Sequence, residues 1–320
     1  MKIRRAIVSF AAITFFYLAV LIWVDSKNQV FSEFPAVLSI LPVLLVLSFL
    51  SYIVRYLRWY WLLSRAGNKT NLVTGYLAYL AGFAFTATPG KVGELLRIRY
   101  LAPQGVPPWR VLAAFVFERA FDLVVVLLLS ALAISQNDIF IFVFAFVVAI
   151  LSVILVAVRN PAWLTRAAVY MRIYRLPKLS RIFKTVRDGL SGCRIWVTLP
   201  DILLSMLLGA VAWIITSFSF VWLLDQLGVS IPVLSALAIY PLAMLAGAAS
   251  MLPGGVGSTE AVIVLLLSLF DVPLETALLA AIGIRISSMW FAIICGLFAL
   301  GFLEFIFSRT VMIRHSKQKG

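Results

Sequence analysis

The strongest chemical signal in this sequence is a small set of charged side chains within long apolar segments. Lys91, Arg119 and Arg285 each interrupt such a segment. An arginine at the centre of a membrane costs about 2.5 kcal/mol or more, so its presence there points to function. Clustered cations in a dry interior suit a phosphate, because charge-assisted hydrogen bonds are strong. These residues predict a site for an anionic head group, although Lys91 has the alternative of reaching back to the cytoplasmic surface.

Four carboxylates accompany these cations. Glu118 and Asp122 are four residues apart and therefore share one face of a helix. Glu94 and Glu260 each follow closely after a Pro-Gly dipeptide, in the expected first turn of a new helix. They act either as structural ion-pair partners or as coupling groups in transport, and the pattern leaves both roles open.

The residues needed for most other chemistry are scarce. The chain has one histidine, His315, and two cysteines, Cys193 and Cys295. We therefore expect no metal site, no cofactor and no disulfide framework. No nucleophile stands beside a base, so we expect no catalytic residue and no enzyme. No phosphate-binding loop of the P-loop type is visible, so we expect no direct use of ATP.

The elements that position these residues must be membrane-spanning helices. Hydrophobic residues make up 63% of the 320 residues and charged residues only 12%. A typical soluble domain is about 45–50% apolar and about 25% charged. The formal net charge of +14 then points to a membrane surface, and we expect no nucleic-acid partner.

Apolar runs of about 20 residues predict six full transmembrane helices. The runs are 6–24, 36–54, 111–134, 139–158, 202–224 and 276–307. Two further apolar stretches run into a Pro-Gly break, which ends a helix because proline lacks an N–H and glycine tolerates unusual backbone angles. We expect both to be re-entrant hairpins, 72–102 and 233–270, that reach the midplane and return. Two full crossings in each place are the alternative. The tip residues are Pro89, Gly90, Gly93, Pro253, Gly254, Gly255 and Gly257.

The two halves of the chain repeat one pattern of span, hairpin and span. Both breaks read Pro-Gly-x-Val-Gly, and an arginine follows each break within the next span. The hairpins enter from opposite sides, which makes the fold an all-α inverted repeat; two independent Pro-Gly kinks are the alternative. The expected parts are an anchor helix (1–35), repeat 1 (36–134), an extra span (135–158), a cytoplasmic amphipathic linker (159–200), repeat 2 (201–308) and a basic tail (309–320).

Basic residues set the predicted orientation. They gather before the first span, after the second span (Arg55 and Arg58 among them), throughout 159–194 and at the C-terminus. All these groups fall on one side if the spans alternate. By the positive-inside rule that side is the cytoplasm, so we expect a multi-pass protein of the cell membrane with both termini cytoplasmic.

The chain resembles the membrane region of the lysylphosphatidylglycerol synthase family, a flippase-like domain. The matching text is TPGKVGELLR at 88–97, FERAFD at 117–122, LPGGVGSTE at 252–260, and Arg285. The resemblance implies movement of lipid between leaflets through a cavity bounded by the two hairpins, and it adds Arg97 to the head-group residues. Because the chain ends at Gly320 without an aminoacyl-transferase domain, we expect a stand-alone member that does not aminoacylate lipid.

Three functions follow from these observations. The first is a flippase or translocator for an anionic phospholipid or a lipid-linked phosphate. The second is a non-transporting lipid-binding subunit of an envelope lipid or glycan synthesis complex, with a lipid-synthesis enzyme as its partner. The third is an intramembrane lipid-modifying enzyme. The sequence leaves open the lipid, the direction, the energy source and the oligomeric state.

Overall fold

The computed structural model describes residues 34–131, 162–173 and 177–317, together with isolated positions between 149 and 160. Every regular element in these stretches is helical. In chain order they are α2 (Phe34–Arg65), α3 (Leu72–Phe83), η2 (Pro89–Leu96), α4 (Arg97–Leu101), η3 (Ala102–Gln104), α5 (Pro108–Ala131), α7 (Ala162–Ile173), α8 (Pro177–Gly192), η5 (Cys193–Trp196), α9 (Leu199–Gln226), α10 (Val233–Ala249), η6 (Pro253–Gly255), α11 (Ser258–Ser268), α12 (Leu274–Arg285), η7 (Ile286–Trp290) and α13 (Phe291–Lys317). The predicted anchor at 6–24 lies outside the described residues, as does most of the predicted span at 139–158.

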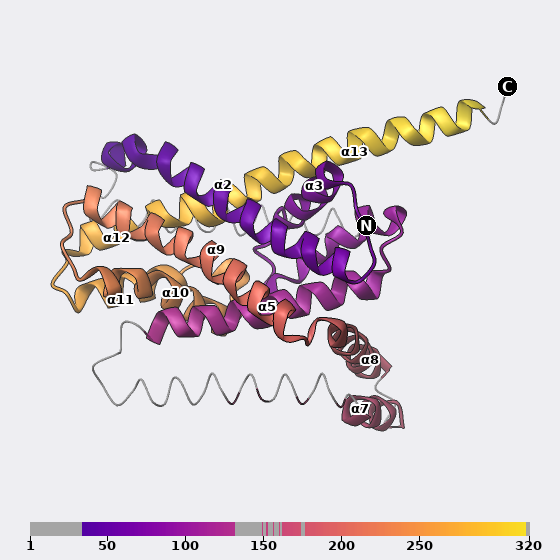
Figure 1. Cartoon of the computed structure of the whole chain (residues 1–320). Helices are drawn as coiled ribbons and strands as arrows, with labels where there is room; N and C mark the ends of the chain where they lie inside the picture. The colour runs from indigo at the N-terminus through magenta and orange to yellow at the C-terminus, as the bar shows by residue number, and fades with distance from the viewer. Residues whose placement is uncertain are drawn as a thin grey trace.

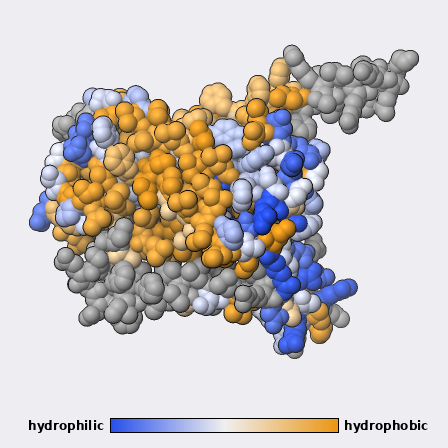
Figure 2. Space-filling view, in the orientation of Figure 1, coloured by the Kyte–Doolittle hydropathy of each residue, from blue (hydrophilic) through white to orange (hydrophobic). Residues whose placement is uncertain are grey.

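Within the part of the chain that the structure describes, three helical segments are long and apolar enough to cross a membrane. They are Val37–Arg65, Leu199–Gln226 and Leu274–Ile306, which correspond to predicted spans at 36–54, 202–224 and 276–307. Their outward faces carry large apolar side chains, which form the broad hydrophobic surface in Figure 2. The expectation of a polytopic all-α membrane protein is therefore confirmed at this coarse level.

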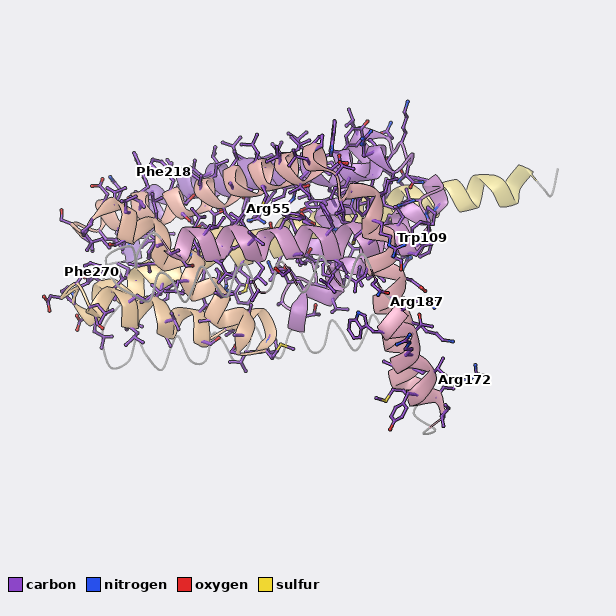
Figure 3. All side chains as sticks on the ribbon, turned by 60° about the horizontal axis from the view of Figure 1, so that its bottom comes forward. Arg55, Trp109, Arg172, Arg187, Phe218 and Phe270 are labelled. Carbon is purple, nitrogen blue, oxygen red and sulfur yellow. The ribbon has the colours of Figure 1, made fainter. Side chains whose placement is uncertain are left out.

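Helix α2 runs farther than its apolar run predicts. No glycine or proline follows the predicted end at Val54 until Gly67, whose φ of +80° ends the helix. The expectation that Arg55 and Arg58 follow the end of the second span is therefore wrong. Both lie on the helix, and Figure 3 shows Arg55 in the middle of the bundle, between Phe270 at one end and Trp109 at the other.

The first arm of each hairpin ends shortly before its Pro-Gly dipeptide: α3 ends at Phe83, before Pro89, and α10 ends at Ala249, before Pro253. The chain restarts differently after each break. After η6 it restarts as an α-helix, α11. After α3 it restarts as the 3₁₀ helix η2, followed by only five residues of α4. The expectation of a regular α-helical second arm is therefore wrong for the first hairpin. A 3₁₀ turn rises more per residue than an α turn and aligns side chains at every third position.

Segments that are far apart in sequence lie side by side in the bundle (Figure 1). Helix α2 packs along α9, α3 packs against α13, and α10 packs against α5. Within each hairpin the arms contact each other, and η2 also touches η6. The two breaks therefore meet inside the bundle, surrounded by the longer helices.

Helices α7 and α8 lie at one end of the bundle, where α8 packs against α5 (Figure 1). Hydrophilic side chains gather at this end in Figure 2, and Figure 3 shows Arg172 and Arg187 here. The predicted amphipathic linker therefore forms two helices at the basic end of the molecule.

Candidate functional site

A cavity of about 410 Å³ lies where the two hairpins meet α2, α5, α9 and the junction of α12 with α13. The first hairpin contributes Lys91 and Glu94, and α5 contributes Arg119 and Asp122. Aromatic, hydroxyl and methionine side chains form much of the remaining wall, including Tyr52, Trp213, Thr216, Tyr240, Met244 and Ser288. The cavity thus combines a charged wall with a largely apolar one.

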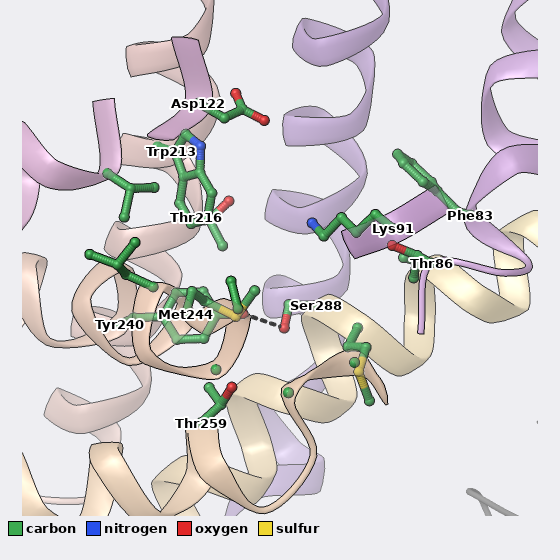
Figure 4. A pocket seen from close by; sticks show the side chains of 18 of the residues that line it. Phe83, Thr86, Lys91, Asp122, Trp213, Thr216, Tyr240, Met244, Thr259 and Ser288 are labelled. Atoms are coloured by element: carbon green, nitrogen blue, oxygen red, sulfur yellow. Dashed lines mark hydrogen bonds between the residues drawn. The ribbon is translucent and has the colours of Figure 1, made fainter. Parts of the chain in front are cut away.

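Lys91 reaches into this cavity from the tip of the first hairpin, opposite Trp213 and Thr216 (Figure 4). Its backbone is left-handed, with a φ of +56°. That conformation is costly for any residue with a Cβ. The matching residue of the second hairpin is Gly255, with a φ of +63°. The first hairpin therefore carries a lysine at a backbone position that favours glycine, which is typical of a functional constraint.

Asp122 is the centre of the charged wall. Its carboxylate lies 2.7 Å from Arg58, 3.2 Å from Arg55 and 3.1 Å from Arg119. Arg55 and Arg119 line the cavity, whereas Arg58 lies behind the wall and is 1% exposed. One carboxylate therefore holds two cavity-facing guanidinium groups in place.

Glu118 lies deeper and is fully buried. It accepts a hydrogen bond from Tyr79 at 2.8 Å and pairs with Arg58 at 3.1 Å. Its second oxygen lies 3.5 Å from Arg119 and 3.6 Å from Arg97. This carboxylate therefore links Arg58, Arg97 and Arg119, and it does not line the cavity.

The structure places Arg97 in the protein core. Its guanidinium pairs with Glu94 at 2.9 Å and stacks on the rings of Trp59 and Tyr79, 4.8 and 3.9 Å from their centroids. Arg97 is fully buried and is absent from the cavity wall, unlike Glu94, which lines it. Cation–π contacts and a buried ion pair of this kind fix the hairpin against α2. We therefore leave Arg97 out of the residues proposed to contact a head group.

Arg285 holds the tip of the second hairpin. Its Nε donates to Glu260 at 2.9 Å, and its Nη2 donates to the carbonyl oxygen of Gly254 at 2.6 Å. The same guanidinium contacts the sulfur atoms of Met244 and Met289. Arg285 lines the cavity, but its donors are directed at the protein. Its role in this conformation is to join the hairpin tip to α12.

A π-helical turn, η7, follows Arg285 directly. π-Helical turns leave backbone groups in need of partners and are frequent at functional sites. The hydroxyl of Tyr52 donates to the carbonyl oxygen of Ser288 at 2.7 Å, and Tyr240 bonds the Ser288 hydroxyl at 2.8 Å (Figure 4). These hydrogen bonds give partners to the carbonyl and hydroxyl groups of Ser288 in the irregular turn. They also place polar groups on the cavity wall that faces Lys91.

Both hairpin tips have a position that requires glycine. Gly254 has a φ of +63°, and a Cβ placed there would lie 2.9 Å from the Sδ of Met289. A Cβ on Gly93 would lie 2.5 Å from the carbonyl oxygen of Phe85. The backbone N–H of Gly257 donates to Glu260 at 2.8 Å and so caps α11. The other predicted tip residues, Pro89, Gly90, Pro253 and Gly255, begin or form the short helices η2 and η6.

Four buried polar atoms on residues that line the cavity have no hydrogen-bond partner among the described residues. They are Ser48 Oγ, Arg119 Nε, Trp213 Nε1 and Thr259 Oγ1. A buried polar atom without a partner costs about 1–3 kcal/mol. Unpaired polar atoms on the residues around a cavity are consistent with a site that binds a polar group.

Sequence reasoning missed Arg55 and the aromatic and hydroxyl wall. The signal for Arg55 was present, because the segment from Ser51 to Arg65 contains no helix breaker. Because Arg55 and Arg58 are three residues apart, an unbroken helix places both side chains on the same face. For Trp213, Tyr240 and Ser288 the sequence offers no comparable signal.

Long apolar helices around a buried ionisable cavity define a polytopic membrane protein with an internal polar site. The sequence profile of the lysylphosphatidylglycerol synthase TM region matches residues 6–296, and the chain belongs to this family. The chain is also similar to a UPF0104 membrane protein of Methanothermobacter thermautotrophicus. The two are 27% identical over 301 residues, which cover 88% of each chain.

Proposed function

We propose that this protein moves a lipid with an anionic head group between membrane leaflets, and that the cavity holds the head group during the passage. The observation that carries the proposal is the set of cations Arg55, Lys91 and Arg119 on the wall of a cavity inside an apolar bundle. Burying a cation in a membrane protein costs free energy unless the cation binds an anion or pairs with an acidic side chain.

The packing of the helices supports an inverted repeat behind this site. A two-fold axis relating the proposed halves would map α2 onto α9, and these helices pack on each other. The same axis exchanges the pair α3 and α13 with the pair α10 and α5, both of which are in contact. We propose six full spans and two re-entrant hairpins, with alternating access arising when one hairpin moves against the other.

The distribution of charge supports an orientation in the cell membrane with the termini in the cytoplasm. The basic helices α7 and α8 lie at one end of the bundle, while the C-terminus of α9 lies at the other (Figure 1). Cysteine substitutions at the exposed positions Gln226 and Lys184 test this arrangement. An impermeant reagent added to intact cells should label position 226 and not 184, and the reverse result would overturn the orientation.

The activity is tested with purified protein in liposomes. Fluorescent phosphatidylglycerol (a diester) and fluorescent phosphatidic acid (a monoester) are placed in both leaflets of separate liposome preparations and exposed to an impermeant quencher. An active protein makes the inner pool of at least one of them accessible. We expect Arg119→Gln to slow this by about tenfold or more, because it removes a charge-assisted contact to the head group. The matched Arg172→Gln changes an exposed arginine on α7 and should leave the rate unchanged.

The result also separates the alternatives. Lipid that stays in its leaflet while still binding to the protein would favour the non-transporting subunit. We propose a transporter rather than an enzyme, so the lipid recovered from the liposomes should be chemically unaltered. Modified lipid would overturn that part of the proposal.

A further inference from the structure

The charges around the cavity do not balance. The described residues of this cluster contain five cations, Arg55, Arg58, Lys91, Arg97 and Arg119, and three carboxylates, Glu94, Glu118 and Asp122. Arg285 and Glu260 form a separate neutral pair at 2.9 Å. The cluster therefore carries two positive charges in excess.

The excess lies on the cavity side. Arg58 and Arg97 are 1% and 0% exposed and face all three carboxylates from behind the wall. Arg55 and Arg119 share one oxygen of Asp122, at 3.2 and 3.1 Å. Lys91 forms no ion pair with any described residue, although it shares the cavity wall with both arginines. Among the described residues, Lys91 pairs with no carboxylate and Arg55 with one, whereas Arg58, Arg97 and Arg119 each pair with two. The two least compensated cations, Lys91 and Arg55, both line the cavity.

Building on the proposed function, we propose that the head group is a phosphate monoester, a dianion, rather than a phosphodiester with a single charge. An uncompensated charge in a low-dielectric interior is costly, and two excess positive charges are neutralised by two negative ones. A monoester also presents three terminal oxygens to the three cavity-facing cations, whereas a diester presents two. The geometry therefore favours a lipid that ends in a phosphate.

The rest of the wall favours a lipid over a free phosphate. Phe83, Leu123, Val126, Trp213 and Leu245 line the same cavity as the cations. Apolar surface of this kind is stabilised by contact with an alkyl chain, which inorganic phosphate lacks. The two sources of the same anion are therefore distinguishable by experiment.

The test compares decyl phosphate with methyl decyl phosphate and with inorganic phosphate. Binding to the full-length protein is measured by calorimetry in a neutral detergent at pH 7, where a monoester with a second pKa of about 6 is mostly a dianion. We expect decyl phosphate to bind about tenfold or more tightly than its methyl ester, since one charge-assisted contact is lost. Inorganic phosphate should bind more weakly than decyl phosphate.

Substitutions of Lys91 test whether its charge causes the preference for decyl phosphate over its methyl ester. Lys91→Met removes one excess charge and should bring the two esters to within about threefold of each other, whereas Lys91→Arg keeps the charge and should preserve the preference. Lys69→Met changes an exposed lysine outside the cavity and should behave as the unaltered protein.

Each result has a distinct meaning. Equal binding of the two esters by the unaltered protein would overturn the dianion while leaving the proposed function intact. No binding of either ester would overturn the proposed function as well. Inorganic phosphate that binds as tightly as decyl phosphate would overturn recognition of a lipid. A monoester preference that survives Lys91→Met would overturn the assignment of the excess charge to Lys91.

Discussion

Replacing Lys91 with glycine should stabilise the protein while it impairs lipid movement. The lysine occupies a left-handed backbone with a φ of +56°. That conformation costs a residue with a Cβ about 1–2 kcal/mol, whereas glycine adopts it freely. Glycine in turn loses about 0.5–1 kcal/mol more conformational entropy on folding. The backbone change alone should therefore raise the free energy of unfolding by about 0.5–1 kcal/mol.

The charge and the backbone are separated by a second variant. Lys91→Met removes the ammonium group but keeps the strained backbone, so Lys91→Gly should be more stable than Lys91→Met by the same amount of about 0.5–1 kcal/mol. Unfolding by SDS in mixed micelles, followed by the fluorescence of the nine tryptophans, measures both free energies. Liposome assays measure lipid movement, which should fall about tenfold or more in both variants.

Two outcomes would refute this reasoning. If Lys91→Gly is less stable than Lys91→Met, the left-handed backbone is not a source of strain. If Lys91→Gly moves lipid at the normal rate, the ammonium group does not contact the head group. A converse control is available at Gly255, where Gly255→Ala should destabilise because its Cβ would lie 2.7 Å from Thr259 Oγ1 and 3.0 Å from the Cα of Gly247.

Three further changes probe the tips and the fold. Gly254→Leu should block lipid movement yet spare membrane insertion, as checked by fractionation, because its side chain separates the touching tips. Arg285→Lys should speed hydrogen exchange at the second tip by about tenfold or more, since one ammonium group cannot hold Glu260 and the Gly254 carbonyl together. Unchanged exchange would contradict the role of Arg285 in joining the hairpin tip to α12. Burial raises the pKa of the Cys193 thiol to about 12, so a maleimide at pH 8 should label it only after unfolding, measured in a Cys295→Ser background. Rapid labelling of the folded protein would contradict the packing of η5.

The sequence by itself determined the class of protein and the places where its helices break. Apolar runs long enough to cross a bilayer reflect a local property of the chain, which no tertiary contact is needed to create. The same is true of the Pro-Gly breaks, because proline and glycine act on their own backbone. It also identified Lys91 and Arg119 as unusual, since charge within an apolar run is visible without a structure.

The tertiary structure decided which of the charged residues line the cavity. Arg97, Arg119 and Arg285 look alike in sequence, yet one stacks on aromatic rings in the core, one lines the cavity, and one holds a hairpin tip. Arg55 joined the site only because α2 continues past its apolar run and packs along α9. A charged side chain is neutralised by whatever lies near it in space, and those neighbours come from helices distant in sequence. The uncompensated charge at Lys91 is therefore a property of the folded protein.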